Sequence, residues 1–234
     1  MIQESIAVVF PAYNEQKNIK CLVSKTFNFL KNNFEDFEII VVDDGSCDDT
    51  YQVCQEIKNK LADSLRVLKH KTNKGYGAAL RTGLFSSNKQ LIFYTDADNQ
   101  FDIQEIIKFV EAIKDVDYVI GYRKDRQDSI IRKFTARCYN KLIRLVFGLK
   151  VKDIDCSFKL FKRECLHSLS IERDNFFIDT ELLIKAMLKG FKLKQIGVKH
   201  FSRQAGKSTV RISHIFTTLG DIAYMHKRIK EKGV

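Results

Sequence analysis

The sequence predicts an α/β fold, with a mostly parallel central sheet flanked by helices. Apolar runs of about four to six residues alternate with amphipathic stretches of about a dozen residues or more, which is the pattern of βαβ units. Most of these runs are apolar throughout, so helices are expected on both faces of the sheet. Acid-rich or polar motifs follow three of the runs, at the strand ends where open α/β sheets bind ligands.

The first half of the chain alternates strictly between strand and helix. Asn14 is expected to cap the first helix, and residues 46–50 supply caps for the second. A glycine pair, Gly75 and Gly77, opens the third helix. The expected strands are Ile6–Phe10, Glu38–Val42, Leu65–Leu68 and Leu91–Thr95, and the expected helices are Glu15–Lys31, a stretch ending near Leu61, and a stretch from Gly75 to about Leu84.

The second half is less regular. Asp102 and Glu105 form a D-x-x-E capping pattern before a helix near Ile103–Ile113. The elements expected after it are a strand Asp117–Gly121, a helix Ser129–Phe147, a strand or turn Asp153–Lys162 returning to the ligand crevice, a helix Phe176–Leu188, a strand Leu193–Phe201 and a helix Arg211–Lys232. We expect one domain over residues 1–210 and an amphipathic, basic C-terminal helix over 211–234.

The charge of the chain indicates an anionic partner. The net charge is +11, and it is concentrated in residues 122–152, with ten Lys/Arg against two Asp, and in residues 200–234, with seven against two acids. Nucleic acid, a phosphorylated ligand and an acidic membrane face are the partner classes that such basicity attracts. A nucleic-acid-binding protein has no need of acidic strand ends, so no nucleic-acid partner is expected.

Cysteine use and hydropathy bear on location. None of the six cysteines forms a C-x-x-C motif, and the N-terminus does not resemble a signal peptide. No apolar run approaches the roughly 18–20 residues that a membrane span needs. The expected location is cytoplasmic, peripheral at the cytoplasmic face of a membrane, because helices Ser129–Phe147 and Arg211–Lys232 mix Lys/Arg with bulky apolar residues. The last helix equally suits docking on the protein's own core or a dimer contact.

The most informative stretch is LIFYTDADNQFD, residues 91–102. In an extended chain alternate side chains share a face, so Asp96, Asp98 and Gln100 can point at one spot. Adjacent carboxylates are unfavourable unless a cation lies between them. Mg²⁺-type ions take one or two carboxylates together with phosphate oxygens. For an isolated D-x-D the alternative is a solvated loop with an Asx turn.

In combination, the motifs resemble the family 2 glycosyltransferases of the GT-A fold, and among them the dolichyl- and polyprenyl-phosphate glycosyltransferases. The resemblance covers about Ile6 to Ser208 in family order. It rests on Pro11-Ala12-Tyr13-Asn14-Glu15, Asp43-Asp44-Gly45-Ser46 with Asp48 and Thr50, Asn73-Lys74-Gly75-Tyr76-Gly77-Ala78-Ala79 with Arg81 and Gly83, Asp96-Ala97-Asp98-Asn99-Gln100, Gly121-Tyr122-Arg123, Asp155-Cys156-Ser157-Phe158-Lys159-Leu160-Phe161, and Arg203 with Gly206-Lys207-Ser208.

The resemblance implies a role for each motif. Asp44 would accept a hydrogen bond from the base, and Asp96 and Asp98, helped by Gln100, would hold Mg²⁺ or Mn²⁺. Arg203 and Ser208 would cover the phosphates from a closing loop. The implied nucleotide-binding residues are Pro11, Tyr13, Glu15, Asp44, Asp96, Ala97, Asp98, Arg203 and Ser208, and the implied catalytic residues are Asp96, Asp98, Arg123 and Arg132. Glu15 is also explained as a first-turn acid that complements a helix dipole.

The acceptor decides whether the enzyme needs a base. A sugar hydroxyl needs a general base within hydrogen-bond reach, whereas a lipid monophosphate is already ionised near neutral pH and needs cations. The resemblance assigns the acceptor phosphate to Arg123 and Arg132, whose forks suit phosphate. The acids that would serve a hydroxyl acceptor are Asp153, Asp155, Asp179 and Glu181; Asp179 is also a candidate helix cap.

The expected function is therefore that of an inverting, metal-dependent glycosyltransferase. It would move a hexose from a UDP- or GDP-sugar to a polyprenyl or dolichyl phosphate at a membrane surface. The alternative is a GT-A enzyme acting on a glycan or other hydroxyl. A homodimer is also considered, because the last helix suits a dimer contact, and so is a membrane-protein partner, because no transmembrane helix is expected in this sequence.

Overall fold

The computed structural model describes residues 1–124, 130–203 and 213–232, with the backbone alone for 130–132, 213–216 and 232. Within these residues the strands are β1 (Ile6–Ala12), β2 (Phe37–Asp43), β3 (Leu65–Lys69), β4 (Leu91–Tyr94), β5 (Tyr118–Lys124), β6 (Lys159–Lys162) and β7 (Leu193–Lys199). The helices are α1 (Ile19–Asn33), α2 (Thr50–Leu61), α3 (Tyr76–Leu84), α4 (Ile106–Ala112), α5 (Ile130–Phe147), α6 (Arg163–His167), α7 (Ile178–Leu188) and α8 (Ser213–Lys232). Short 3₁₀ turns cover Ala62–Ser64, Ile103–Glu105 and Ile113–Asp115.

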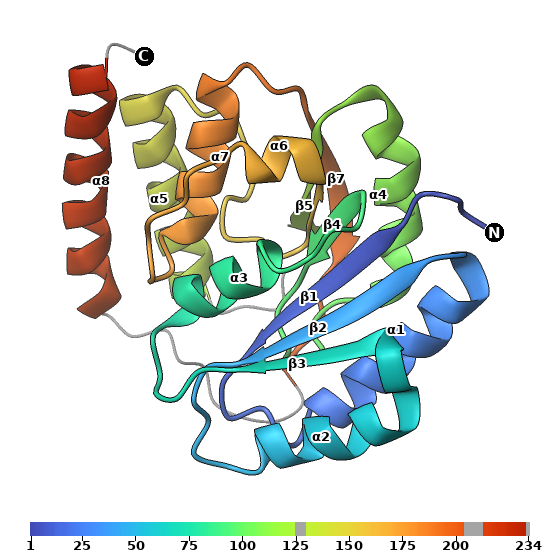
Figure 1. Ribbon diagram of the computed structural model, residues 1–234. Helices are drawn as coiled ribbons and strands as arrows, with labels where there is room; N and C mark the ends of the chain where they lie inside the picture. The colour runs from blue at the N-terminus through green and yellow to red at the C-terminus, as the bar shows by residue number, and fades with distance from the viewer. Residues whose placement is uncertain (125–129, 204–212, 233–234) are drawn as a thin grey trace.

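The sheet lies between two layers of helices (Figure 1). Because side chains alternate along a strand, Ile6, Val8 and Phe10 of β1 join the core beneath α1, α2 and α4. The intervening Ala7 and Val9 join the second core, which α3, α5, α6, α7 and α8 cover. This two-sided burial explains why the strand runs are apolar throughout.

The strand order places the ends of β1 and β4 at a topological switch point. The sheet runs β3-β2-β1-β4-β6-β5-β7 in the described residues, so the chain leaves β1 toward β2 on one side and returns to it with β4 on the other. Ligands bind at such a point in α/β sheets. Strands β1 to β4 are mutually parallel, β5 is parallel to β7, and β6 is antiparallel to both of its neighbours.

The antiparallel direction of β6 has a functional consequence. Its first residue, Lys159, lies opposite Tyr94 at the carboxyl end of β4 and opposite Ile120 in β5. The segment before it, Asp153–Phe158, is therefore delivered to the same edge as the motifs after β1, β2 and β4. The expected return of this segment to the crevice is confirmed.

The expected elements are found, with differences at the starts of helices: α2 begins at Thr50, and the side chain of its N-cap Asp49 makes no capping hydrogen bond. The first helix begins at Ile19 rather than at Glu15, and Asn14 does not cap it: Asn14 has a left-handed φ of 57°, and its side chain accepts a hydrogen bond from the amide of Cys47. Asparagine tolerates that conformation better than most residues. The short helix α6 was not expected from the sequence.

Helix α8 docks on the protein. Its Ile222 and Met225 are buried in the same core as Ile184 of α7, and Figure 1 shows it beside α5 and α7. This is the own-core docking that was an alternative for the last helix, and the boundary at residue 210 stays a prediction. Among the described residues no helix combines the length and the apolarity that crossing a membrane requires.

Candidate active site

Two loops at the switch point are tied to each other. The amide of Asn14, after β1, donates to the Ser46 hydroxyl after β2 at 2.9 Å, and the Cys47 amide donates back to Asn14 Oδ1 at 2.8 Å. The Glu15 amide donates to Thr50 Oγ1 at 2.8 Å. These cross-links hold the PAYNE loop (Pro11–Glu15) and the DDGS loop (Asp43–Ser46) in one orientation at the edge of the sheet.

Asp96 and Asp98 lie together after β4. Asp96 accepts from the Tyr76 hydroxyl at 3.0 Å and from the Ser157 hydroxyl at 2.6 Å. Asp98 accepts from the amide of Gln100 at 3.1 Å. Desolvation, and then the charge of Asp98, raises the pKa of Asp96 from 3.8 to about 6, and desolvation also raises the pKa of Asp98. The charged pair is thus disfavoured in the protein alone, and a cation next to it would relieve that cost.

Arg203 supplies one positive charge at this point. Its guanidinium forms an ion pair with Glu15 and lies 3.9 Å from Asp98 Oδ2. Burial raises the pKa of Glu15, while the hydrogen bond from Asn18 and the charge of Arg203 oppose the rise. The structure therefore brings together residues from the PAYNE loop, the D-x-D and the end of β7, which are up to 188 positions apart in the chain.

Gln100 holds the segment that precedes Arg203. Its side-chain amide donates to the carbonyl of Phe201 at 2.9 Å, and the Phe201 amide donates to the Gln100 carbonyl at 2.9 Å. Since Arg203 follows two residues later, these bonds fix where Arg203 leaves the sheet. Gln100 as a metal ligand stays a prediction.

Asp44 is buried, and its carboxylate bonds to other residues of the protein. Only 2% of it is exposed. Its carboxylate contacts His70 Nδ1 at 2.6 Å and accepts from the amides of Lys74 at 3.0 Å and Gly75 at 2.8 Å. The described structure therefore gives Asp44 the role of fixing the entry to α3. Contact of Asp44 with a nucleobase stays a prediction.

The remaining predicted nucleotide residues line the same strand ends. Pro11 is the penultimate residue of β1 and pairs with Val42. Tyr13 follows, half-buried. Ala97, which stands between the two acids in the sequence, is buried in the core. Ser208 lies outside the described residues.

The predicted acceptor arginine Arg123 is paired with an acid. Its Nε and Nη2 both donate to Asp153 at 2.7 Å, a bidentate bond of the kind that is strong in proteins. The bond takes one side of the guanidinium fork, and only 8% of the Arg123 side chain is exposed, so contact of Arg123 with an acceptor phosphate stays a prediction. Arg132 belongs to α5, but its side chain lies outside the described residues.

Of the four candidate bases, three are engaged elsewhere. Asp153 binds Arg123. Glu181 is buried and accepts from backbone amides of residues 172 and 173. Asp179 is buried, accepts from the Tyr94 hydroxyl at 2.5 Å and pairs with Lys159; it lies inside the first turn of α7 and is not its cap, which is Phe177.

Asp155 differs from these three. It is accessible to solvent, yet desolvation by the surrounding protein, and then the charge of Asp179, raises its pKa to about 6. A carboxylate with a pKa near neutrality suits a general base. A role of Asp155 as the base for a hydroxyl acceptor stays a prediction.

The donor set fits a divalent cation that is shared with a ligand. Among the described residues no group of three or more His, Cys, Asp or Glu is arranged to enclose a metal. Two carboxylates whose charges disfavour each other are present at Asp96 and Asp98. Mg²⁺ and similar ions bind through one or two carboxylates and complete their shell with phosphate oxygens and water.

The residues that hold the acids of this site in place were given no role from the sequence. Tyr76 and Ser157 appeared within quoted motifs but had no role, although both hold Asp96. His70, which links Asp44 to Thr82, was not singled out. Each contact joins residues that are far apart in the chain, so no local pattern marks it.

Comparisons with known proteins place this geometry in a family. The model of the family described as "Glycosyl transferase family 2" matches residues 7–169. Dodecaprenyl-phosphate galacturonate synthase of Rhizobium johnstonii is 27% identical over 93% of this chain and 65% of its own length. Dolichyl-phosphate beta-glucosyltransferase of Saccharomyces cerevisiae is 27% identical over 90% of this chain and 71% of its own length. The chain thus spans about two thirds of these relatives.

Solved structures agree on the fold. Mannosyl-3-phosphoglycerate synthase from Rubrobacter xylanophilus superimposes with a TM-score of 0.73 at 17% identity, covering 98% of this chain and 75% of that one. Glucosyl-3-phosphoglycerate synthase from Mycobacterium tuberculosis, solved with Mn²⁺, UDP and glucosyl-3-phosphoglycerate, gives 0.66 at 18% identity, covering 99% and 81%. The expected GT-A fold is confirmed, and the chain belongs to glycosyl transferase family 2.

Proposed function

We propose that this protein is an inverting, metal-dependent glycosyltransferase that moves a hexose from a UDP- or GDP-sugar to a polyprenyl phosphate. The observation that carries the proposal is the Asp96–Asp98 pair at the switch point, with raised pKa values and Arg203 beside it. The names of the relatives support the acceptor class, because they act on dodecaprenyl and dolichyl phosphates.

The first half of the chain would hold the donor. The PAYNE and DDGS loops, fixed to each other, form the nucleotide side, and Asp96 and Asp98 would hold Mg²⁺ or Mn²⁺. When bound, the ion would offset the charge that builds on the leaving nucleoside diphosphate. Arg203, released in part from Glu15, would contact the phosphates together with Ser208.

The second half would hold the acceptor. An ionised phosphate oxygen forms the new bond to the anomeric carbon, while the bond from that carbon to the nucleoside diphosphate breaks and the diphosphate takes the electron pair. In-line attack inverts the anomeric centre. Because no proton has to be removed, cations at Arg123 and Arg132 serve this acceptor better than a base does.

The second candidate is transfer to a hydroxyl, which the accessible Asp155 favours.

Incubation with radiolabelled nucleotide-sugar and membrane extract separates the two. Our proposal predicts label in the organic phase, in a product that mild acid releases as sugar. Label that stays in water-soluble glycan alone would establish the second candidate instead.

We further propose that α5 and α8 rest on the cytoplasmic face of a membrane. On α5, Phe134 is 65% exposed and Leu145 is 74% exposed, and the exposed residues near them include Arg137, Lys141 and Arg144. On the neighbouring α8, Leu219 is 49% exposed. Apolar side chains among basic ones are typical of helices at an anionic bilayer surface.

Leu145→Glu is expected to weaken binding to vesicles that contain anionic phospholipid by about tenfold or more, because burial of a leucine contributes about 1.5–3 kcal/mol. Co-sedimentation measures this. Gln52→Glu adds the same charge at an exposed position of α2, so it serves as the control and should bind as the wild type does. Equal binding of all three proteins would contradict the membrane contact.

A further inference from the structure

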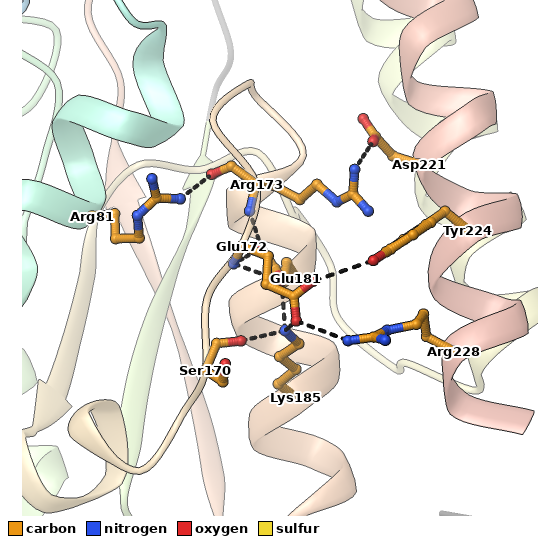
Figure 2. Close-up of polar contacts among 9 residues, drawn as sticks. All are labelled: Arg81, Ser170, Glu172, Arg173, Glu181, Lys185, Asp221, Tyr224 and Arg228. Atoms are coloured by element: carbon orange, nitrogen blue, oxygen red, sulfur yellow. Dashed lines mark hydrogen bonds and ion pairs between the residues drawn. The ribbon is translucent and has the colours of Figure 1, made fainter. Parts of the chain in front are cut away.

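Residues Glu172–Asn175, here called the bridge segment, are held by the C-terminal helix. Arg173 Nη1 donates to Asp221 Oδ1 at 3.0 Å, and Asn175 Nδ2 donates to Asp221 Oδ2 at 2.7 Å. Only 7% of Asp221 is exposed. The Arg173 guanidinium also lies 4.0 Å from the centre of the Tyr224 ring, and Figure 2 shows these side chains of α8 turned toward the segment.

Helix α7 holds the same segment from another side. The carboxylate of Glu181 accepts from the amides of Glu172, at 3.0 and 3.1 Å, and Arg173, at 2.8 Å. Lys185 neutralises Glu181 at 2.6 Å (Figure 2). Carboxylates that accept backbone hydrogen bonds make strong contacts. The bridge segment is thus fixed between α7 and α8.

The opposite side of the bridge segment contacts the start of α3. The carbonyl of Asp174 accepts from the amides of Gly77 at 2.8 Å and Ala78 at 3.2 Å, and Arg81 pairs with the Asp174 carboxylate at 2.6 Å. A Cβ atom at Gly77 would lie 2.6 Å from the carbonyl oxygen of Arg173. The two backbones therefore touch directly, and a movement of the bridge segment must move the first turn of α3.

The first turn of α3 carries Tyr76, which holds Asp96, one of the two proposed metal ligands. Tyr76 begins α3, stacks on Phe176 with 5.2 Å between ring centres, and donates its hydroxyl to Asp96 at 3.0 Å. The preceding Gly75 donates its amide to Asp44 at 2.8 Å. The contacts thus run from Asp221 through the bridge segment to two of the acids at the sheet edge.

We propose that α8 positions the metal site: Asp221, acting through the bridge segment and Tyr76, sets the orientation of Asp96. Asp221 is a positioning residue here and touches neither donor nor acceptor. Partners that orient a metal ligand change metal affinity by about 10–100-fold when they are removed. The inference rests on the proposed function only in taking Asp96 as a metal ligand, and it gives the C-terminal helix a second role besides membrane contact.

Asp221→Ala tests the proposal without any assay of transfer. Amide hydrogen exchange should become about tenfold faster or more at Gly77 and Ala78, because hydrogen bonds to a charged group contribute enough to hold the bridge segment in place. The dissociation constant for Mn²⁺, measured by electron paramagnetic resonance, should rise about tenfold. Glu231→Ala is the matched control, since it removes an exposed ion pair with Lys227 on the same helix and should change neither value.

A second variant covers the case in which Asp221→Ala fails to fold. Tyr76→Phe keeps the ring stacking and removes only the hydroxyl, so Mn²⁺ affinity should fall about tenfold while exchange at Gly77 and Ala78 stays at the wild-type rate. Wild-type Mn²⁺ affinity in Tyr76→Phe, or wild-type exchange in a folded Asp221→Ala, would overturn the inference. A protein that shows the coupling but transfers no sugar would overturn the proposed function instead.

Discussion

Asp98→Ala is expected to reduce sugar transfer by about a thousandfold while leaving the fold intact. A bound divalent cation supplies several kcal/mol of stabilisation to a developing negative charge, and each 1.4 kcal/mol corresponds to a factor of about ten in rate. We propose that Asp98, together with Asp96, would hold that ion, and Arg203 lies 3.9 Å from Asp98 Oδ2. The loss should appear in kcat with saturating donor and acceptor.

The stability of this variant makes the test specific. In the absence of metal, Asp98→Ala removes a charge that raises the pKa of Asp96, so its melting temperature should equal or exceed that of the wild type. Asp102→Ala is the control from the same loop: Asp102 accepts from the amide of Gln104 at 3.0 Å, and losing that cap costs about 1 kcal/mol without affecting transfer. Wild-type transfer by Asp98→Ala in the presence of EDTA would show that the metal assignment is wrong.

Arg203→Ala is expected to lower kcat/KM for the nucleotide-sugar by about 10- to 100-fold, mainly through KM. A hydrogen bond to a charged group contributes about 1.5–3 kcal/mol, which corresponds to that range of rate. The variant also leaves Glu15, whose pKa burial already raises, without its cation. KM for the lipid phosphate should change little, because Arg203 lies beside Glu15 and Asp98, which we assign to the donor.

Two further variants separate this role from stability. Arg66 pairs with Glu38, near the start of β2, at 3.0 Å. Arg66→Ala is thus the control: it removes an arginine that neutralises a buried acid at the amino end of β2, away from the carboxyl ends of the strands, and it should leave donor KM unchanged. Glu15→Gln removes the negative charge that Arg203 neutralises. A double-mutant cycle of Arg203→Ala and Glu15→Gln therefore measures the coupling energy between these two side chains. Equal changes in KM for donor and acceptor in Arg203→Ala would contradict the assignment.

The sequence predicted the sheet and the D-x-D because both depend on local patterns. The strand Leu91–Tyr94 is uniformly apolar and Asp96 follows two residues after it, so the burial of the strand and the position of the acids at its carboxyl end follow from the local sequence. Asn14 was misassigned because asparagine favours both helix caps and left-handed backbone. The choice between them was made by the Ser46 and Cys47 loop, which lies over thirty positions away.

The residues that hold Asp96 and Arg123 in place come from distant parts of the chain, so the sequence did not reveal them. Tyr76 and Ser157 reach Asp96 from 20 and 61 positions away. The bidentate partner of Arg123 became visible only when β6 was found to run antiparallel, which brings Asp153 to the same edge. Strand direction is set by connections in three dimensions and leaves little trace in a strand of four residues such as Lys159–Lys162, whose sequence is KLFK.

The most direct test of the account uses purified protein, radiolabelled UDP- and GDP-sugars, Mn²⁺ and two matched acceptors, a polyprenyl phosphate and the corresponding polyprenol. The proposed function predicts transfer from one of the donors to the phosphate alone, with loss of transfer on adding EDTA and inversion at the anomeric carbon. Transfer to the polyprenol, or transfer to the phosphate that EDTA does not affect, would contradict it.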